Sequence, residues 1–225
     1  MIRLQQVSKV YSLGTVEVRA LDGATLTIEP GEFVALVGPS GCGKTTLLNL
    51  MAGIDRPTSG EVWLEGERLD CLSDDRLTRL RRNKIGIVYQ FFNLLPTLTA
   101  RENVALPLLL DGLQQGEIER RVEQGLQRVG LTHRAEHWPH ELSGWEQQRV
   151  AIARAIVAGP RVVLADEPTG NLDSVAGGAI LDLLAQLHHD QGQTIVLATH
   201  SPEAVRRAGR IVHLRDGKIE GLDGP

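Results

Sequence analysis

The chain has 225 residues and a net charge of −4, with 42% hydrophobic and 23% charged residues. These values are typical of a globular protein with a sizeable buried core, and the acidic balance gives no reason to expect a nucleic-acid partner. No apolar run approaches the roughly 18 residues of a membrane span, the N-terminus has no secretion-signal pattern, and two cysteines provide no disulfide framework.

The first segments of the chain alternate between apolar and polar residues. Apolar residues recur at Ile2, Leu4 and Val7 and again at Ala24, Leu26 and Ile28. This period of two predicts antiparallel strands. Between them, Val10–Gly14 is expected to form a turn that carries the aromatic residue Tyr11.

A glycine-rich loop follows the apolar run Phe33–Val37, which predicts a buried strand, and precedes Leu47–Met51, which predicts a helix. Its sequence fits the phosphate-loop pattern G-x-x-x-x-G-K-[ST] and consists of Gly38, Pro39, Ser40, Gly41, Cys42, Gly43, Lys44, Thr45 and Thr46. Glycines let successive N–H groups face phosphate oxygens at a helix N-terminus. Lys44 would then bridge the β- and γ-phosphates, and the Thr45 hydroxyl would hold Mg²⁺.

The remainder of the chain alternates predicted strands and helices. Helices are expected over residues 73–83, over 99–130 with breaks near Pro107 and Gly112, over 144–158, and over 174–189 with Ser174 as the cap. Strands are expected over residues 61–65, 84–90, 162–165, 194–199 and 211–214, with a closing turn at Gly217. Apolar strands that alternate with helices predict a parallel α/β sheet with an antiparallel β appendage at the front.

Four polar side chains stand at the ends of three of these strands, at the edge where an open α/β sheet binds its ligand. Asp166 can bind Mg²⁺ through water, and Glu167 is placed to orient or deprotonate an attacking water. The Gln90 amide could contact both Mg²⁺ and that water, and the His200 imidazole could reach the γ-phosphate. Each alone could be an ordinary surface group, but together after a phosphate loop they indicate a nucleotide-hydrolysing site.

The segment Leu142–Gln147, which reads Leu-Ser-Gly-Trp-Glu-Gln, completes a set of motifs that resembles the nucleotide-binding subunit of an ATP-binding cassette (ABC) transporter over nearly the whole chain. The resemblance implies the ABC ATPase fold, ATP and Mg²⁺ as ligands, and stacking of Tyr11 on adenine. It assigns Gln90, Glu167 and His200 to hydrolysis and Thr45, Gln90 and Asp166 to the metal. The signature and D-loop residues that it adds to the nucleotide site are Ser143, Gly144, Trp145 and Asp173.

A finer resemblance points to the bacterial branch that serves lipoprotein release, macrolide export and FtsE-type cell division. It rests on Gln90–Thr99 and Ala165–Asp173, together with the segment around Tyr11. The branch implies a homodimer with ATP held between the subunits, bound to a membrane permease at the cytoplasmic face of the inner membrane. The apolar loop Phe91–Leu98 is the expected dock for that permease, because exposed apolar residues mark interaction sites; its alternative is ordinary core.

Two residues depart from the family pattern. The second glycine of the signature is Trp145, whose backbone amide and the Ser143 side chain would contact the γ-phosphate of ATP on the other subunit. An indole turned toward the partner would hinder closure and slow hydrolysis, whereas an indole turned aside would leave the N–H usable. Cys42 stands where many relatives have serine. We expect its alkylation to block nucleotide binding, unless it is simply a tolerated small residue.

These expectations amount to a single ABC ATPase domain over residues 1–225. Residues 1–90 and 159–225 are expected to form a phosphate-loop core with the antiparallel β subdomain, and residues 91–158 a helical subdomain. Hydrolysis would drive a membrane transporter or a mechanotransmission complex. The alternatives are a nucleotide-gated scaffold impaired by Trp145 and a soluble cassette ATPase of DNA repair or translation, for which the chain has no room for coiled-coil insertions.

Overall fold

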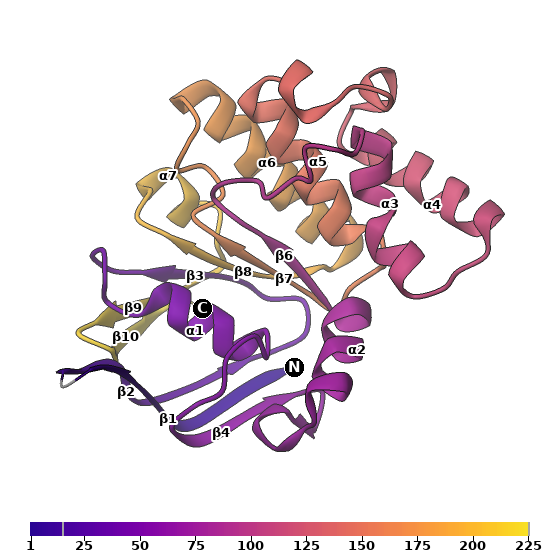
Figure 1. The fold of residues 1–225 in the computed structure, drawn as a ribbon. Coiled ribbons are helices and arrows are strands. Elements are labelled where there is room, and N and C mark those ends of the chain that lie inside the picture. The colour runs from indigo at the N-terminus through magenta and orange to yellow at the C-terminus, as the bar shows by residue number, and fades with distance from the viewer. Residues whose placement is uncertain (15, 225) are drawn as a thin grey trace.

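A six-stranded sheet runs through the middle of the protein in the computed structural model, which describes residues 1–14 and 16–224 (Figure 1). Its order is β10-β9-β3-β8-β7-β6, with bounds β3 Phe33–Val37, β6 Ile85–Val88, β7 Val162–Asp166, β8 Thr194–Thr199, β9 Arg210–Arg215 and β10 Lys218–Asp223. All strands except β10 are parallel. The parallel α/β sheet is therefore confirmed, and β10 is an edge strand that the sequence patterns did not predict.

A four-stranded antiparallel sheet forms the second layer, in the order β2-β1-β4-β5. Its strands are β1 Ile2–Leu13, β2 Val16–Ile28, β4 Ser59–Leu64 and β5 Glu67–Arg68. The turn expected over Val10–Gly14 is wrong, because β1 continues to Leu13 and Tyr11 pairs with Val18. The β-favouring residues of this segment extend the ladder, and Gly14 adopts a left-handed φ of 64° where the strand ends.

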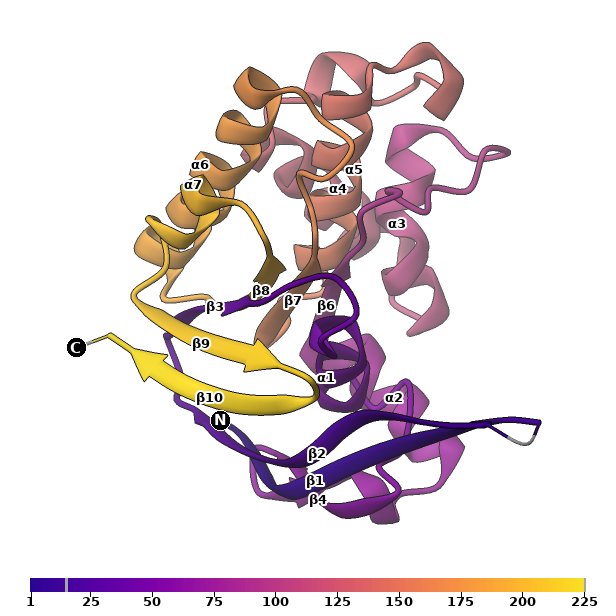
Figure 2. The same ribbon diagram turned by 90° about the vertical axis from the view of Figure 1, so that its left-hand side faces the viewer.

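The helices lie on both sides of the six-stranded sheet. They are α1 Lys44–Met51, α2 Asp74–Lys84, α3 Ala100–Leu110, α4 Gln115–Arg128, α5 Gly144–Ile156, α6 Ser174–Gln191 and α7 Pro202–Val205. Helix α1 lies between the two sheets, whereas α5 and α6 cover the opposite face (Figures 1 and 2). Among residues 1–14 and 16–224, no helix combines the length and the apolarity needed to cross a bilayer.

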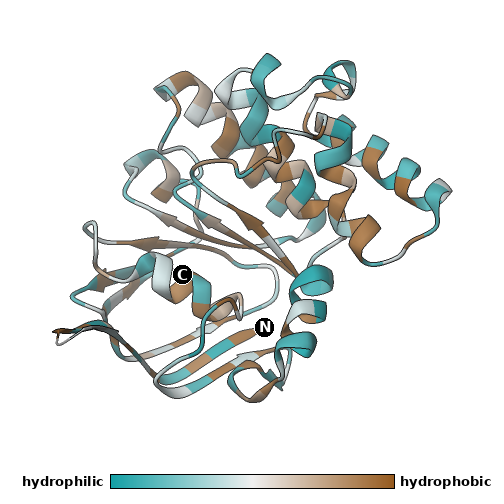
Figure 3. Cartoon of the chain, in the orientation of Figure 1, coloured by the Kyte–Doolittle hydropathy of each residue, from teal (hydrophilic) through white to brown (hydrophobic). Residues whose placement is uncertain are grey.

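Two hydrophobic clusters fill the space on either side of the six-stranded sheet. Along β8, Ile195 and Leu197 pack into the cluster with α3 to α6, and Val196 and Ala198 pack into the cluster with α1 and the antiparallel sheet. Figure 3 shows the resulting brown strands enclosed by helices whose outer faces are teal. Burial of both faces explains why the central strands read as continuous apolar runs.

Two local expectations about helices are also wrong. Pro107 lies inside α3 and does not break it. A proline there removes one backbone hydrogen bond, and packing of α3 against α4 and α5 keeps the helix intact up to Leu110. Asp173, and not Ser174, caps α6, because its carboxylate accepts from the N–H groups of Val175 and Ala176 at 3.0 and 2.9 Å. The short helix α7 was not predicted.

Candidate functional site

The loop Gly38–Thr46 connects β3 to α1 and packs tightly against two neighbouring strands. A Cβ at Gly43 would stand 2.5 Å from the carbonyl oxygen of Ala20 in β2. A Cβ at Gly38 would collide with the carbonyl oxygen of Leu214 in β9. Gly43 also holds a left-handed φ of 106° immediately before α1. These positions accept glycine alone, and the loop that they allow ends at the N-terminus of α1, an arrangement that binds phosphate.

Lys44 is the cation of this loop, and its side chain is buried. Its ammonium group donates to the carbonyl oxygens of Gly38 and Pro39 at 2.8 and 3.2 Å. The positive charge is therefore held within the ring of the loop, beside the helix N-terminus. Charge and N–H donors converge on one point, as a bound phosphate chain requires.

A hydroxyl and a carboxylate meet across the sheet edge beside the loop. The Thr45 hydroxyl, on α1, donates to an Asp166 carboxylate oxygen at the end of β7 over 3.1 Å. Burial raises the pKa of Asp166, and the neighbouring Glu167 carboxylate raises it further, against the lowering effect of the Thr45 hydrogen bond and of Lys44. Oxygen donors of this type suit a hard divalent cation, whose charge would stabilise the ionised form of Asp166.

Glu167 and His200 form the next pair along the same edge. His200 Nδ1 lies 2.9 Å from a Glu167 carboxylate oxygen, with His200 following β8 and Glu167 following β7. Glu167 adopts a left-handed φ of 45°, and its N–H donates to the carbonyl oxygen of Ala198 at 3.0 Å. The backbone strain is thus held by the sheet, which is typical of functional positions. A carboxylate oriented by an imidazole can accept a proton from water.

Gln90 lies two residues beyond β6, where it pairs with a residue that the sequence reasoning left out of the site. The Gln90 amide donates to the Asn171 side chain at 3.3 Å, and the Asn171 amide donates to the Gln90 carbonyl oxygen at 3.0 Å. Gln148 of α5 was also missed. It is fully buried and donates to the carbonyl oxygens of Tyr89 and Pro168 at 3.3 and 2.8 Å. Both residues join the Gln90 segment to the segment after β7.

Tyr11 lies on β1, where a charged cluster holds its side chain in place. Its hydroxyl donates to Asp55 at 2.8 Å, and the Lys9 ammonium lies 4.8 Å from the ring centroid. Burial raises the pKa of Tyr11, the Asp55 carboxylate raises it further, and a hydrogen bond with Thr46 lowers it. The hydrogen bond to Asp55 fixes the position of the Tyr11 ring on β1.

The signature residues Ser143, Gly144 and Trp145 open α5, on the sheet face opposite to α1. Ser143 caps the helix together with Glu146, whose carboxylate accepts from the Ser143 hydroxyl at 2.6 Å. The Trp145 indole is 38% exposed. The structure therefore does not bring these residues to the phosphate loop within one copy of the chain. The Asp173 carboxylate accepts hydrogen bonds from the first turn of α6 and so caps that helix.

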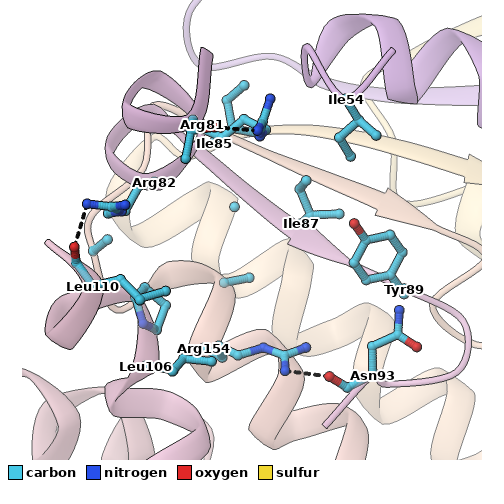
Figure 4. Close-up of a pocket in the computed structure, with 15 residues that line it drawn as sticks. Ile54, Arg81, Arg82, Ile85, Ile87, Tyr89, Asn93, Leu106, Leu110 and Arg154 are labelled. Carbon is cyan, nitrogen blue, oxygen red and sulfur yellow. Dashed lines mark hydrogen bonds between the residues drawn. The ribbon is translucent and has the colours of Figure 1, made fainter. Parts of the chain in front are cut away.

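A groove of about 460 Å³ opens beside the Gln90 segment, between α2, β6, α3 and α5 (Figure 4). Its lining combines the apolar side chains of Ile87, Leu106 and Leu110 with the polar groups of Tyr89, Asn93 and Arg154. The Arg154 guanidinium donates to the carbonyl oxygens of Asn93 and Phe92 at 2.6 and 2.8 Å. In the loop that follows β6, Phe91 is 71% exposed and Leu95 is 43% exposed.

Together, a phosphate loop, an adjoining hydroxyl–carboxylate pair and a carboxylate oriented by a histidine define a nucleoside triphosphatase of the phosphate-loop class. Comparison with known proteins narrows this class to one family. The family model described as ABC transporter matches residues 21–170. An ABC transporter ATP-binding protein of Thermotoga maritima is 49% identical over 222 residues, which are 99% of this chain and 94% of that protein.

Two named relatives and one solved structure agree with this assignment. The lipoprotein-releasing system ATP-binding protein LolD of Xanthomonas euvesicatoria is 47% identical over 98% of this chain and 91% of its own length. The macrolide export ATP-binding/permease protein MacB of Hyphomonas neptunium is 48% identical over 97% of this chain, but 34% of its own length. The dimeric ATP-binding cassette MJ0796, bound to ADP and Pi, superposes with a TM-score of 0.92 at 43% identity, covering 100% of this chain and 98% of that chain.

The chain therefore belongs to the ABC transporter family and is an ATP-binding, ATP-hydrolysing subunit of that class. The resemblance drawn from its motifs is confirmed, and so is the ABC ATPase fold.

Proposed function

We propose that two copies of this chain close face to face over ATP, with each nucleotide held by the phosphate loop of one copy and the signature of the other. The observation that carries this proposal is the placement of Ser143–Trp145 on the sheet face opposite to α1, where they cannot reach the loop of their own copy. A two-fold arrangement supplies both halves of the site twice. The dimeric solved relative supports it.

Within each site, we assign Mg²⁺ to Thr45 and Asp166, with Gln90 completing its surroundings, because their oxygens suit a hard cation beside a phosphate chain. Bound Mg²⁺ would neutralise charge on the β- and γ-phosphates. Glu167 accepts a proton from the attacking water while His200 orients that carboxylate, and Lys44 holds the phosphates. Tyr11 provides the surface on which the adenine stacks.

The membrane partner is assigned to the groove of Figure 4 and the exposed loop Phe91–Leu98 at its rim. An amphipathic helical segment of a permease would place apolar side chains against Ile87 and Leu110 and its backbone near Arg154. The relatives named for lipoprotein release and macrolide export suggest a transport or mechanotransmission complex of that branch. The subunit would then lie peripherally on the cytoplasmic face of the membrane. Residues 91–158 would act in it as a helical subdomain against the core of 1–90 and 159–225.

A second reading, in which Trp145 makes the chain a hydrolysis-impaired scaffold, depends on where the indole lies. In the structure the ring stacks on Arg149, with 4.7 Å between the guanidinium carbon and the ring centroid. This contact favours the active subunit over the scaffold, because it holds the ring against a side chain of its own helix.

Steady-state hydrolysis of Mg-ATP by the chain, beside Glu167→Gln and Trp145→Gly, tests the proposal. We expect the hydrolysis rate of Glu167→Gln to be at least about 100-fold below that of the parent chain, the usual effect of losing a general base. Trp145→Gly should stay within about threefold of the parent chain if the indole is accommodated. A parent rate equal to that of Glu167→Gln, together with a much faster Trp145→Gly variant, would establish the scaffold instead. Removal of Mg²⁺ with a chelator should abolish the parent rate.

A further inference from the structure

The Trp145 indole is held by a fixed cation. Trp145 and Arg149 are four residues apart on α5, so their side chains lie on the same face one turn apart. The guanidinium carbon lies 4.7 Å from the ring centroid, within the range of a cation–π contact. The Arg149 side chain thereby holds the ring against α5.

Arg149 is itself anchored from a second element. It donates to the carbonyl oxygen of Val129, the residue that follows α4, at 2.8 Å. A carbonyl at the C-terminal end of a helix carries partial negative charge and favours a cation. The guanidinium therefore sits between the end of α4 and the indole, and its position does not depend on Trp145 alone.

The position of the indole decides whether the N-terminus of α5 is open. The N–H groups of Gly144 and Trp145 belong to the first turn, which helix geometry leaves without intrahelical partners. Ser143 and Glu146 satisfy each other in a capping box at the same end. A ring held against Arg149 is not free to fold over these N–H groups, whereas a ring released into another rotamer could cover them.

We propose that Arg149 is a positioning residue that keeps the Trp145 indole off the N-terminus of α5, so that this N-terminus can receive the nucleotide phosphates of a second copy. The inference rests on the proposed shared site. It explains how a chain with tryptophan in place of a glycine retains a usable signature. The partner it serves is the triphosphate of ATP held on the facing copy.

The stacking itself is tested without nucleotide by tryptophan fluorescence. In a chain carrying Trp63→Phe and Trp138→Phe, Trp145 is the only remaining tryptophan of the three. Arg149→Met should make its emission shift to longer wavelength and should raise its quenching by acrylamide, an uncharged quencher, about twofold, because the ring loses its cover. Identical emission and quenching with arginine and methionine would overturn the stacking, whatever the ATPase activity is.

The functional consequence is tested by a double-mutant cycle of Mg-ATP hydrolysis, with Trp145→Gly as the matched background. Arg149→Met should lower kcat about two- to fivefold in the parent chain, the factor that corresponds to an exposed cation–π contact, and less than twofold in the glycine background. Both backgrounds lose the Val129 hydrogen bond, so the effect of that loss on kcat cancels in the comparison. An equal loss in both backgrounds would overturn the proposal.

A failure of the proposed function would give a different result from a failure of the Arg149 inference. If neither the parent chain nor Trp145→Gly hydrolyses ATP faster than Glu167→Gln, the shared site is refuted, and the role of Arg149 in it falls as well. The fluorescence result would still decide whether Arg149 holds the indole.

Discussion

At the scale of single residues, the side chains proposed to carry the chemistry could be placed at one edge of the sheet wherever they follow a predicted strand. Asp166, Glu167 and His200 follow apolar runs, and parallel strands bring their carboxyl ends to one edge. The distances of 3.1 Å from Thr45 to Asp166 and 2.9 Å from His200 to Glu167 confirm that these groups meet. The contacts of Asn171 and Gln148 could not be predicted, because their partners are backbone and amide groups of segments remote in sequence.

Gly43 and Gly41 form a matched pair for testing the phosphate loop. Gly43→Ala should destabilise the loop by about 2 kcal/mol or more and abolish ATP binding, because its Cβ would meet Ala20 at 2.5 Å with φ at 106°. Gly41→Ala, with nothing within 4 Å of its Cβ and φ at 79°, should cost only about 1 kcal/mol. Calorimetric titration with ATP checks both, and equal affinities would contradict this description of the loop.

The Cys42 thiol is less accessible than its place in the loop indicated. Its side chain is 3% exposed, and its sulfur lies 4.0 Å from the Lys44 ammonium. We expect a thiol reagent to modify exposed Cys71 first and Cys42 at least about tenfold more slowly, because modification requires local opening. Once formed, the Cys42 adduct should block nucleotide binding, and ATP should slow its formation. Peptide mapping during the reaction measures both rates, and similar rates would show that the loop opens freely.

At the scale of elements, the spacing of apolar residues predicted the strands and helices that pack on the sheet. It failed where contacts with other elements determine the local structure. The alternation of β1 slips at Gln6, whose φ is 48°, so Ile2, Leu4 and Val7 still share the buried face. Pro107 stayed within α3, against its usual reading as a breaker, because neighbouring helices pack around it. The edge strand β10 has only two half-buried residues, Ile219 and Gly221, and its register shifts between them, so its alternation is short.

Arg154 should control the shape of the loop between β6 and α3. It donates to the carbonyl oxygens of Phe92 and Asn93, which hold left-handed φ values of 61° and 49°. Burial lowers the pKa of the Arg154 guanidinium. Arg154→Met should lower stability by about 1–3 kcal/mol through unsatisfied carbonyls and should speed hydrogen exchange across residues 91–98.

The matched control is Arg120→Met, since Arg120 is exposed on α4 and pairs with Glu117. This exposed pair should contribute little. Unchanged exchange in the loop with Arg154→Met would show that the loop keeps its shape by other means, and the proposed dock would then lose its rigid rim.

At the scale of the whole molecule, the sheet separates the two groups of residues that are proposed to share the nucleotide. The phosphate loop and Thr45 belong to the side of α1, and Ser143 belongs to the side of α5. Motif order in the sequence could predict the fold and the family, because the motifs occur in a fixed succession. It could not predict the direction of the Trp145 indole, which depends on Arg149 and on the end of α4.

The central claim, that each ATP is hydrolysed between two copies, is tested most directly by mixing two inactive variants. Lys44→Ala removes the phosphate-binding cation and Ser143→Arg blocks the signature, so neither homodimer should hydrolyse Mg-ATP. A mixed dimer contains one site with an intact phosphate loop and an intact signature, so an equimolar mixture should recover about a quarter of the parent rate under two-fold symmetry. A mixture as inactive as its components would contradict the shared site.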